Sequence, residues 1–180
     1  EGNAWNEIEL LLINCQGRVL DSACGTGSVI DRLQKYPQLQ VHGFDISDFL
    51  LEKAVSRGIG RDRLTKADAT NIPFADNSFD YSYSIGSMEH FTEEGIEKFI
   101  VENHRITQRA AFHFVPASRT GNNEGWIKPK QSYFNNSTQW WLSKFRQYFP
   151  TVYVLESRWE DSLSIGKWFI CRKEKVNENL

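Results

Sequence analysis

Three acidic residues stand where short apolar segments end, and a glycine-containing turn follows the first of them. Asp21 precedes the turn Ala23-Cys24-Gly25-Thr26-Gly27, Asp45 ends the segment QVHGFD, and Asp68 follows the segment LTKA. Glycines permit a tight turn and let a ligand approach backbone amides that a Cβ would shield. A carboxylate at Asp45 can accept hydrogen bonds from both hydroxyls of a ribose, and Asp68 stands in position beside a base. The pattern indicates a nucleoside site.

The glycine spacing limits which nucleotide the turn could hold. The run Gly25-x-Gly27-x-x-Ile30 lacks the third glycine of the dinucleotide fingerprint. A helix that starts near Ser28 would still point its free N–H groups at a ligand in the turn. A pyrophosphate cradle is therefore disfavoured, and a nicotinamide-dependent oxidoreductase is the weaker alternative.

Apolar segments alternate with segments of helical periodicity, as in layered α/β proteins. Strands are predicted over 18–23, 40–45, 64–67, 79–85, 110–115, 151–156 and 165–172, and helices over 3–14, after Gly27, over 48–57 with Ser47 as N-cap, after the N-cap Thr92, and over 137–148. The early strands are continuous apolar runs, typical of parallel strands covered on both faces. We expect an open, doubly wound sheet whose ligand lies beyond the carboxyl ends of the strands. Pro116 should end the fifth strand, before an irregular loop over 117–136.

The composition fits one globular domain over residues 1–180, with 40% hydrophobic and 24% charged residues and a net charge of −2. This charge gives no reason to bind duplex nucleic acid or an anionic membrane, and no apolar run approaches the roughly 18 residues of a membrane span. Three cysteines without a CxxC pair argue against a disulfide framework or a zinc site. Since no secretory signal is recognisable, we expect a cytoplasmic protein without metal. The oligomeric state stays open.

The segment VLDSACGTGSVI is followed by GFDIS and then by ADATNIPFADNSFDYSYSIGSMEHF. In sequence and spacing these segments resemble the motifs of the class I S-adenosylmethionine-dependent methyltransferases, over most of residues 16–91. The nearest type is that of the small-molecule methyltransferases of ubiquinone biosynthesis. The resemblance implies a Rossmann-like seven-stranded sheet, mostly parallel with an antiparallel last strand and helices on both faces. It also implies S-adenosylmethionine as the cofactor and S-adenosylhomocysteine as its product.

Carried over to this sequence, the resemblance implies specific cofactor contacts. Asp21 would order the loop and the methionine amine through water, Asp45 would bind the ribose, and Asp68 would bond the adenine amino group. Ile46 and Ala69 would flank the adenine, while Ser84 and Ile85 would close the site near the sulfonium. The implied cofactor-binding residues are Trp5, Asp21, Ala23, Cys24, Gly25, Gly27, Asp45, Ile46, Asp68, Ala69, Ser84 and Ile85. Ala23 replaces the first glycine of the family motif.

His90 is the candidate general base, because a neutral imidazole is the common base near neutral pH. Such a base is needed only if the methyl acceptor carries a proton that must leave. A structural role for His90 or Glu89, capping a loop or helix, is the alternative. His113 lies inside the fifth strand and is expected to be packed or to face solvent, and Cys24 is expected to be a small filler, not a nucleophile.

Aromatic and basic residues follow the fifth strand, where the family places its acceptor-side insertions. Residues 1–102 carry 9 Lys and Arg against 17 Asp and Glu, whereas residues 103–155 carry 7 against 1. The second segment is either a basic wall suited to an anionic small molecule or a chance distribution of solvated surface residues. The substrate-binding candidates are Glu89, Arg119, Trp126, Lys128, Lys130 and Tyr133.

The sequence therefore predicts a methyltransferase that acts on a small-molecule acceptor, with an apolar or planar part and a negative group. A catalytically silent relative that binds the cofactor or a partner protein is the second hypothesis. The residues do not determine whether an oxygen, nitrogen or carbon atom is methylated.

Overall fold

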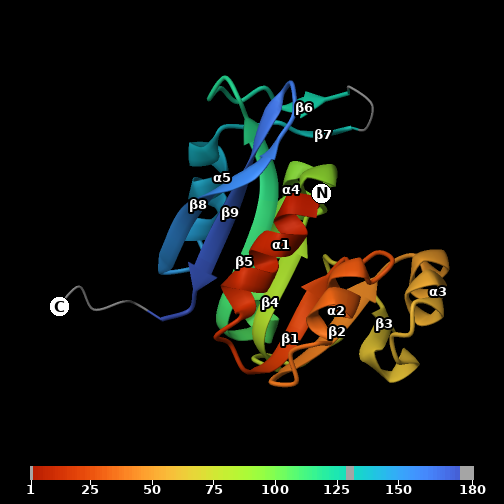
Figure 1. Cartoon of the computed structure of the whole chain (residues 1–180). Coiled ribbons are helices and arrows are strands. Elements are labelled where there is room, and N and C mark those ends of the chain that lie inside the picture. Colours follow the sequence, from red (N-terminus) through yellow and green to blue (C-terminus); the bar gives the residue numbers. More distant parts are fainter. Residues whose placement is uncertain (1, 129–131, 175–180) are drawn as a thin grey trace.

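Seven strands build one twisted sheet in the computed structural model, which describes residues 2–128 and 132–174 (Figure 1). Their order across the sheet is β3-β2-β1-β4-β5-β9-β8. The strands are β1 (Gly17–Ser22), β2 (Leu39–Asp45), β3 (Leu64–Lys66), β4 (Phe79–Ile85), β5 (Thr107–Ser118), β8 (Thr151–Glu160) and β9 (Ser164–Arg172).

The chain direction changes at one strand of this sheet. β1 to β5 pair in parallel, whereas β9 runs antiparallel to both of its neighbours, β5 and β8. The strand order reverses at β1, because β2 lies on one side of it and β4 on the other. The predicted mostly parallel, doubly wound sheet is therefore confirmed. Ligands of such sheets bind at the carboxyl ends of the strands beside this reversal.

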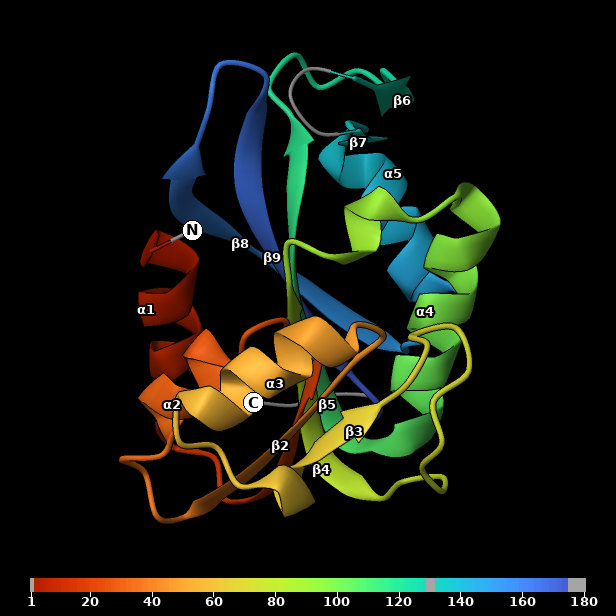
Figure 2. The ribbon, with the colours of Figure 1, turned by 90° about the vertical axis from the view of Figure 1, so that its right-hand side faces the viewer.

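Helices cover both faces of the sheet, as predicted (Figure 2). On one face α1 (Gly2–Leu12), α2 (Ser28–Leu33) and α3 (Asp48–Ser56) pack into one apolar cluster, and on the other α4 (Glu93–Ile106) and α5 (Thr138–Arg146) pack into a second. β5 serves both, since Phe112 and Phe114 face the first cluster and Ala111 and Val115 the second. Its alternating residues point to opposite faces, so both sides of the strand are buried from Ala110 onward.

The predicted helix starts at Ser47 and Thr92 are confirmed. The Ser47 hydroxyl accepts a hydrogen bond from the Leu50 N–H, and the Thr92 hydroxyl accepts one from the Gly95 N–H. Each cap satisfies an N–H that has no partner within its helix. α4 is the longest described helix with 14 residues, and no helix of residues 2–128 and 132–174 is long and apolar enough to cross a membrane.

The prediction that Pro116 ends the fifth strand is wrong. β5 runs on to Ser118, and Pro116 pairs with Gly166 of β9. The carbonyl of Phe114 accepts from the Gly86 N–H beyond the end of β4, so the backbone N–H and C=O of Phe114 point toward β4. The backbone polar groups of Pro116, two residues later, point to the same side, where β4 has already ended. Its missing N–H therefore costs no ladder hydrogen bond.

The predicted loop over 117–136 contains a small hairpin. β6 (Trp126–Ile127) pairs antiparallel with β7 (Tyr133–Phe134), and residues 129–131 between them lie outside the described residues. β8 also extends four residues past its predicted end at 156. The β8–β9 hairpin consequently reaches the same end of the molecule as the β6–β7 hairpin (Figure 1).

Two phenylalanines near the end of β2 test the packing. Phe44 is 1% exposed within the cluster under α4 and α5, whereas Phe49 on α3 is 66% exposed. Phe44→Ala should lower the free energy of unfolding by about 3–5 kcal/mol, because it leaves a cavity. Phe49→Ala is the matched control and should change it by less than about 0.5 kcal/mol. Urea denaturation measures both, and equal losses would contradict the core assignment.

Candidate active site

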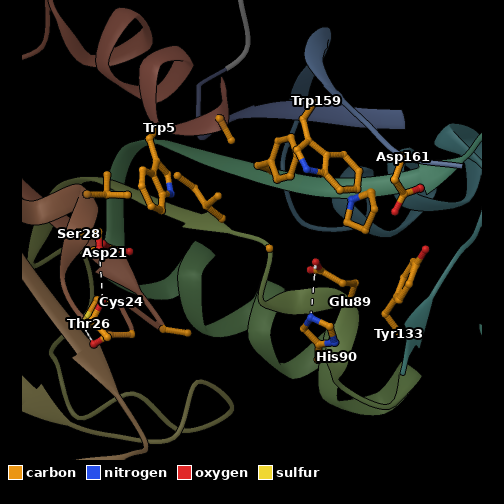
Figure 3. A pocket seen from close by; sticks show the side chains of 18 of the residues that line it. Trp5, Asp21, Cys24, Thr26, Ser28, Glu89, His90, Tyr133, Trp159 and Asp161 are labelled. Atoms are coloured by element: carbon orange, nitrogen blue, oxygen red, sulfur yellow. Dashed lines mark hydrogen bonds and ion pairs between the residues drawn. The ribbon is translucent and has the colours of Figure 1, made fainter. Parts of the chain in front are cut away.

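A cavity of about 650 Å³ lies at the carboxyl ends of β1, β4 and β5 (Figure 3). One end is lined by the turn after β1 and by Ala4 and Trp5 of α1. The other end is lined by the short helix η2 (Met88–His90), by β7 and by the β8–β9 hairpin. The volume falls in the range of ligand pockets, about 300–1,000 Å³. The cavity thus joins the predicted cofactor turn to the predicted acceptor side.

The turn after β1 is held in left-handed backbone conformations. Ala23, Gly25 and Gly27 have φ angles of 61°, 55° and 69°. A Cβ added to Gly25 would meet nothing within 4 Å, so this face of the turn is open to a ligand. A Cβ on Gly27 would instead overlap Ile59 and Ala54, so Gly27 allows close helix packing and does not line the cavity. Ala23 adopts the same region at some steric cost, because it carries a Cβ.

Asp45 fastens this turn to β2. Its Oδ2 accepts from the Gly25 N–H at 2.9 Å, and its Oδ1 accepts from the Ser47 N–H at 2.9 Å. The side chain is buried and is not among the residues that line the cavity. Each carboxylate oxygen has a second lone pair, so Asp45 can still accept hydrogen bonds from ligand hydroxyls.

The residues predicted to contact adenine lie at the ends of β2 and β3, outside the cavity. Ile46 is exposed and Ala69 is buried. Asp68 is exposed, and its Oδ1 accepts from the N–H and the hydroxyl of Thr70, both at 2.8 Å. These two hydrogen bonds lower the pKa of Asp68.

Asp21 is a buried carboxyl that lines the cavity. Burial raises its pKa to about 7, and the negative charge of Asp45 adds to the rise, while the Tyr83 hydroxyl partly offsets it. Burial also raises the pKa of the Cys24 thiol, which lines the same end. Cys24 therefore stays a thiol near neutral pH, in line with its predicted role as a filler.

The side chains of Ser84 and Ile85, both predicted to contact the cofactor, lie in different surroundings. Ile85 lines the cavity, whereas Ser84 is fully buried with its hydroxyl 2.8 Å from Nδ1 of His113. The His113 ring stacks on Phe145 at 5.2 Å, and burial lowers its pKa to about 3. His113 is therefore a packed neutral residue of the core, and the Ser84 side chain points into that core.

His90 and Glu89 point toward each other at the far end of the cavity (Figure 3). His90 Nδ1 lies 2.8 Å from the carbonyl oxygen of Ser132, which can only accept, so Nδ1 carries the proton. In the neutral ring Nε2 is then an acceptor, and it lies 3.9 Å from Glu89 Oε1. Glu89 is buried, and burial raises its pKa to about 8.

The described residues of the predicted basic wall do not line the cavity. Arg119 donates to the Glu160 carboxylate at 2.8 Å and to the Asp161 carbonyl at 2.7 Å, so it ties β5 to the β8–β9 hairpin. Trp126 and Lys128 are outside the cavity lining, and Lys130 lies outside the described residues. Tyr133 does line the cavity, with its hydroxyl 2.8 Å from the Ser164 hydroxyl. Within the described chain, the lining includes no Lys or Arg.

The sequence analysis missed the part of the lining that comes from the chain's end. Trp159 and Asp161 stand at the β8–β9 hairpin, and Phe114 and Pro116 are on the extended end of β5. The sequence Trp159-Glu160-Asp161 combines an aromatic side chain with two carboxylates, which was the available signal. The strand was predicted to end at 156, which left this motif unplaced.

Glu7 holds α1, and with it Trp5, over the cavity. Its carboxylate accepts from the Ser157 hydroxyl at 2.7 Å, the Arg158 N–H at 2.8 Å and the Trp168 indole N–H at 2.8 Å. Hydrogen bonds to a charged acceptor are stronger than neutral ones. The first helix is therefore anchored on the last two strands.

The buried Asp21 makes stability depend on pH. An unfolded Asp has a pKa of about 3.9, so the folded protein binds the extra proton between that value and about 7. The free energy of unfolding should therefore fall as the pH rises from about 4 to about 7, by up to roughly 4 kcal/mol. Asp21→Asn should remove this part of the fall, and the exposed Asp31→Asn should not. If urea titrations give the same pH dependence of the free energy of unfolding for wild type and Asp21→Asn, Asp21 is not its source.

Comparison with known proteins finds matches over the part of the chain that carries the predicted cofactor motifs. A family model described as "Methyltransferase domain" matches residues 19–110. The chain is 36% identical over 85 residues to a demethylmenaquinone methyltransferase of Geobacillus kaustophilus, covering 43% of this chain and 36% of that protein. It is 42% identical over 66 residues to a ubiquinone/menaquinone biosynthesis C-methyltransferase of Desulfotalea psychrophila, covering 36% and 27%.

Solved structures agree over nearly the whole chain. A protein of Pyrococcus horikoshii superposes with a TM-score of 0.74 at 20% identity, over 97% of this chain and 92% of that one. A SAM-dependent methyltransferase of Methanosarcina mazei gives a TM-score of 0.70 at 16% identity, over 92% and 96%. At these low sequence identities, the superpositions establish the fold alone. The chain spans about a third of the length of the first curated relative. The family match confirms that this chain belongs to the methyltransferase-domain family, the class I S-adenosylmethionine-dependent methyltransferases, whose cofactor is S-adenosylmethionine.

Proposed function

We propose that this chain transfers a methyl group from S-adenosylmethionine to a small-molecule acceptor by in-line displacement. The observation that carries the proposal is the cavity that connects the open glycine turn after β1 with the His90 ring. A methyl donor and its acceptor must share one water-poor space in which they can be aligned, and alignment supplies much of the rate enhancement.

The residues present fit the cofactor. Gly25 leaves an open face toward the cavity, and Asp21 offers a buried carboxyl without a Lys or Arg among the described lining residues. A ligand with cationic sulfonium and amino groups compensates such a carboxyl. When bound, the cofactor supplies a methyl group on a positively charged sulfur. Trp5, Asp21, Ala23, Cys24, Gly25 and Ile85 would hold its methionine half, and Asp45, Ile46, Asp68 and Ala69 its nucleoside half.

His90 is suited to act as the general base. Because Nδ1 donates to the Ser132 carbonyl, the lone pair of Nε2 is free to accept a proton from the acceptor. The backbone carbonyl fixes both the tautomer and the ring orientation. Proton acceptance by a positioned side chain contributes typically about 10²–10⁴-fold to the rate.

The acceptor end favours a planar or apolar molecule. Phe114, Tyr133 and Trp159 line it, together with the carboxyls of Glu89 and Asp161. With Arg119 paired to Glu160, the anionic group expected from the sequence has no described cation to bind there. The name of one matched relative, demethylmenaquinone methyltransferase, supports a small-molecule acceptor.

Loss of the Asp45 carboxylate should weaken cofactor binding. Asp45→Ala should raise the Kd for S-adenosylhomocysteine at least about tenfold, because charge-assisted hydrogen bonds to the ribose and to the Gly25 N–H are lost. Asp45→Asn keeps one acceptor oxygen and should fall between Ala and wild type. Calorimetry measures the three constants, with NAD as the competing ligand and Asp31→Ala as the control. Tight binding of NAD without binding of S-adenosylhomocysteine would favour an oxidoreductase and contradict the proposal.

Removal of the imidazole should slow transfer and spare cofactor binding. His90→Ala should lower kcat by about 10²–10⁴-fold, while the Kd for S-adenosylhomocysteine stays unchanged. The matched control is His104→Ala, since His104 packs on Phe149 away from the cavity. Transfer of a labelled methyl group to a small-molecule extract is the readout. Binding of S-adenosylhomocysteine without any transfer would support a silent binding protein instead.

A further inference from the structure

Glu89 lines the cavity and carries a buried polar atom that the fold leaves unsatisfied. Its side chain is 5% exposed and lines the acceptor end. Its Oε2 has no hydrogen-bond partner in the part of the chain that the structure describes. Buried polar atoms are nearly always hydrogen-bonded, so an unsatisfied oxygen on a carboxyl that lines a cavity points to a ligand that this carboxyl would bond.

The surroundings of Glu89 determine what that atom can be. The titratable groups that share the cavity are His90 on the same short helix, Tyr133 on β7, Asp161 in the β8–β9 hairpin, and Asp21 and Cys24 after β1. None of them is a fixed cation, and His90 presents the lone pair of Nε2, 3.9 Å from Glu89 Oε1. An ionised carboxylate would meet this lone pair, with no Lys or Arg among the described lining residues to compensate its charge. Burial accordingly raises the pKa of Glu89 to about 8, so at pH 7 the group is mostly the neutral acid with an O–H to donate.

The acid and the imidazole offer a ligand complementary hydrogen-bonding groups. Neutral Glu89 donates, whereas Nε2 of His90 accepts, and the two groups are separated by 3.9 Å. A ligand that satisfies both must present an acceptor atom and an O–H close together. Oxygens on neighbouring carbons meet this condition, and the rings of Phe114, Tyr133 and Trp159 favour a flat ligand.

We propose that Glu89 acts as a neutral hydrogen-bond donor that selects methyl acceptors with a second, uncharged oxygen on the carbon beside the reactive hydroxyl. The inference rests on the proposed methyl transfer and names its acceptor class: a planar molecule with vicinal oxygens, such as a catechol or a hydroxyl beside a carbonyl. The hydroxyl directs its O–H to His90, and the neighbouring oxygen accepts from Glu89. The rival arrangement is an ionised Glu89 that binds a cationic amine.

Two substitutions separate these arrangements. Glu89→Gln keeps an N–H donor of similar size but cannot carry a charge, and Glu89→Leu removes all hydrogen bonding at similar volume. Glu94→Gln on the exposed side of α4 is the control. Calorimetry with S-adenosylhomocysteine comes first, because its failure in wild type would reject the proposed function and not the role of Glu89.

The S-adenosylhomocysteine-loaded proteins are then titrated with 2,3-dihydroxynaphthalene and with 2-naphthol, which lacks the second oxygen. Wild type, Glu89→Gln and Glu94→Gln should bind the diol about tenfold more tightly than the naphthol, and Glu89→Leu should bind both alike. Equal binding of the two probes by wild type would overturn the proposal. So would a Glu89→Gln variant that behaves like Glu89→Leu, or tighter binding of the cation 1-naphthylmethylammonium than of the diol.

The charge of Glu89 is measured independently of any probe. The infrared difference between wild type and Glu89→Gln at about pH 7 should contain the carbonyl band of an un-ionised carboxylic acid. The band should disappear as the pH rises through about 8. Asp21 is common to both proteins and cancels in the difference. Carboxylate bands in place of the acid band at pH 7 would refute the neutral donor, whichever acceptor the protein uses.

Discussion

Parallel pairing of β1 with both β2 and β4 is the constraint on which the site depends. It brings the turn after β1, the end of β2 and the short helix after β4 to one edge of the sheet. Asp45 then bonds the Gly25 N–H across from the neighbouring strand, which fixes the open face of the turn. Backbone amides at such a turn become available to a ligand because the connection after β1 leads to α2 on one face and the connection after β4 leads to α4 on the other.

The two ends of the cavity use the same physical device for different purposes. Asp21 and Glu89 are both buried carboxyls whose pKa values rise to about 7 and about 8, chiefly through burial. At the cofactor end, a cationic ligand would restore the charge of Asp21. At the acceptor end, the neighbouring imidazole is an acceptor, and the neutral form of Glu89 is the one that can bond. Burial thus raises the pKa of both acids, and the partner at each end of the cavity decides whether the charged form of Asp21 or the neutral form of Glu89 is used.

The far ends of the described chain close this space together. Glu7 on α1 bonds the side chains of Ser157 and Trp168 and the backbone of Arg158, so Trp5 is held against the cavity by the last strands of the sheet. Arg119 similarly secures the β8–β9 hairpin, which carries Trp159 and Asp161. The basic residue predicted to attract an anion instead fixes the wall of the acceptor end.

Local sequence determined the succession of strands and helices up to β5, the caps at Ser47 and Thr92, and the glycine turn, because each follows from residues a few positions apart. It also named Asp21, Gly25, Ile85, Glu89, His90 and Tyr133, which line one cavity. Tertiary structure alone decided that Ser84 points into the core, that Arg119 pairs with Glu160, and that Trp159 lines the cavity. Those outcomes depend on partners 29 to 41 residues away or on where a hairpin ends in space, and no local pattern encodes them.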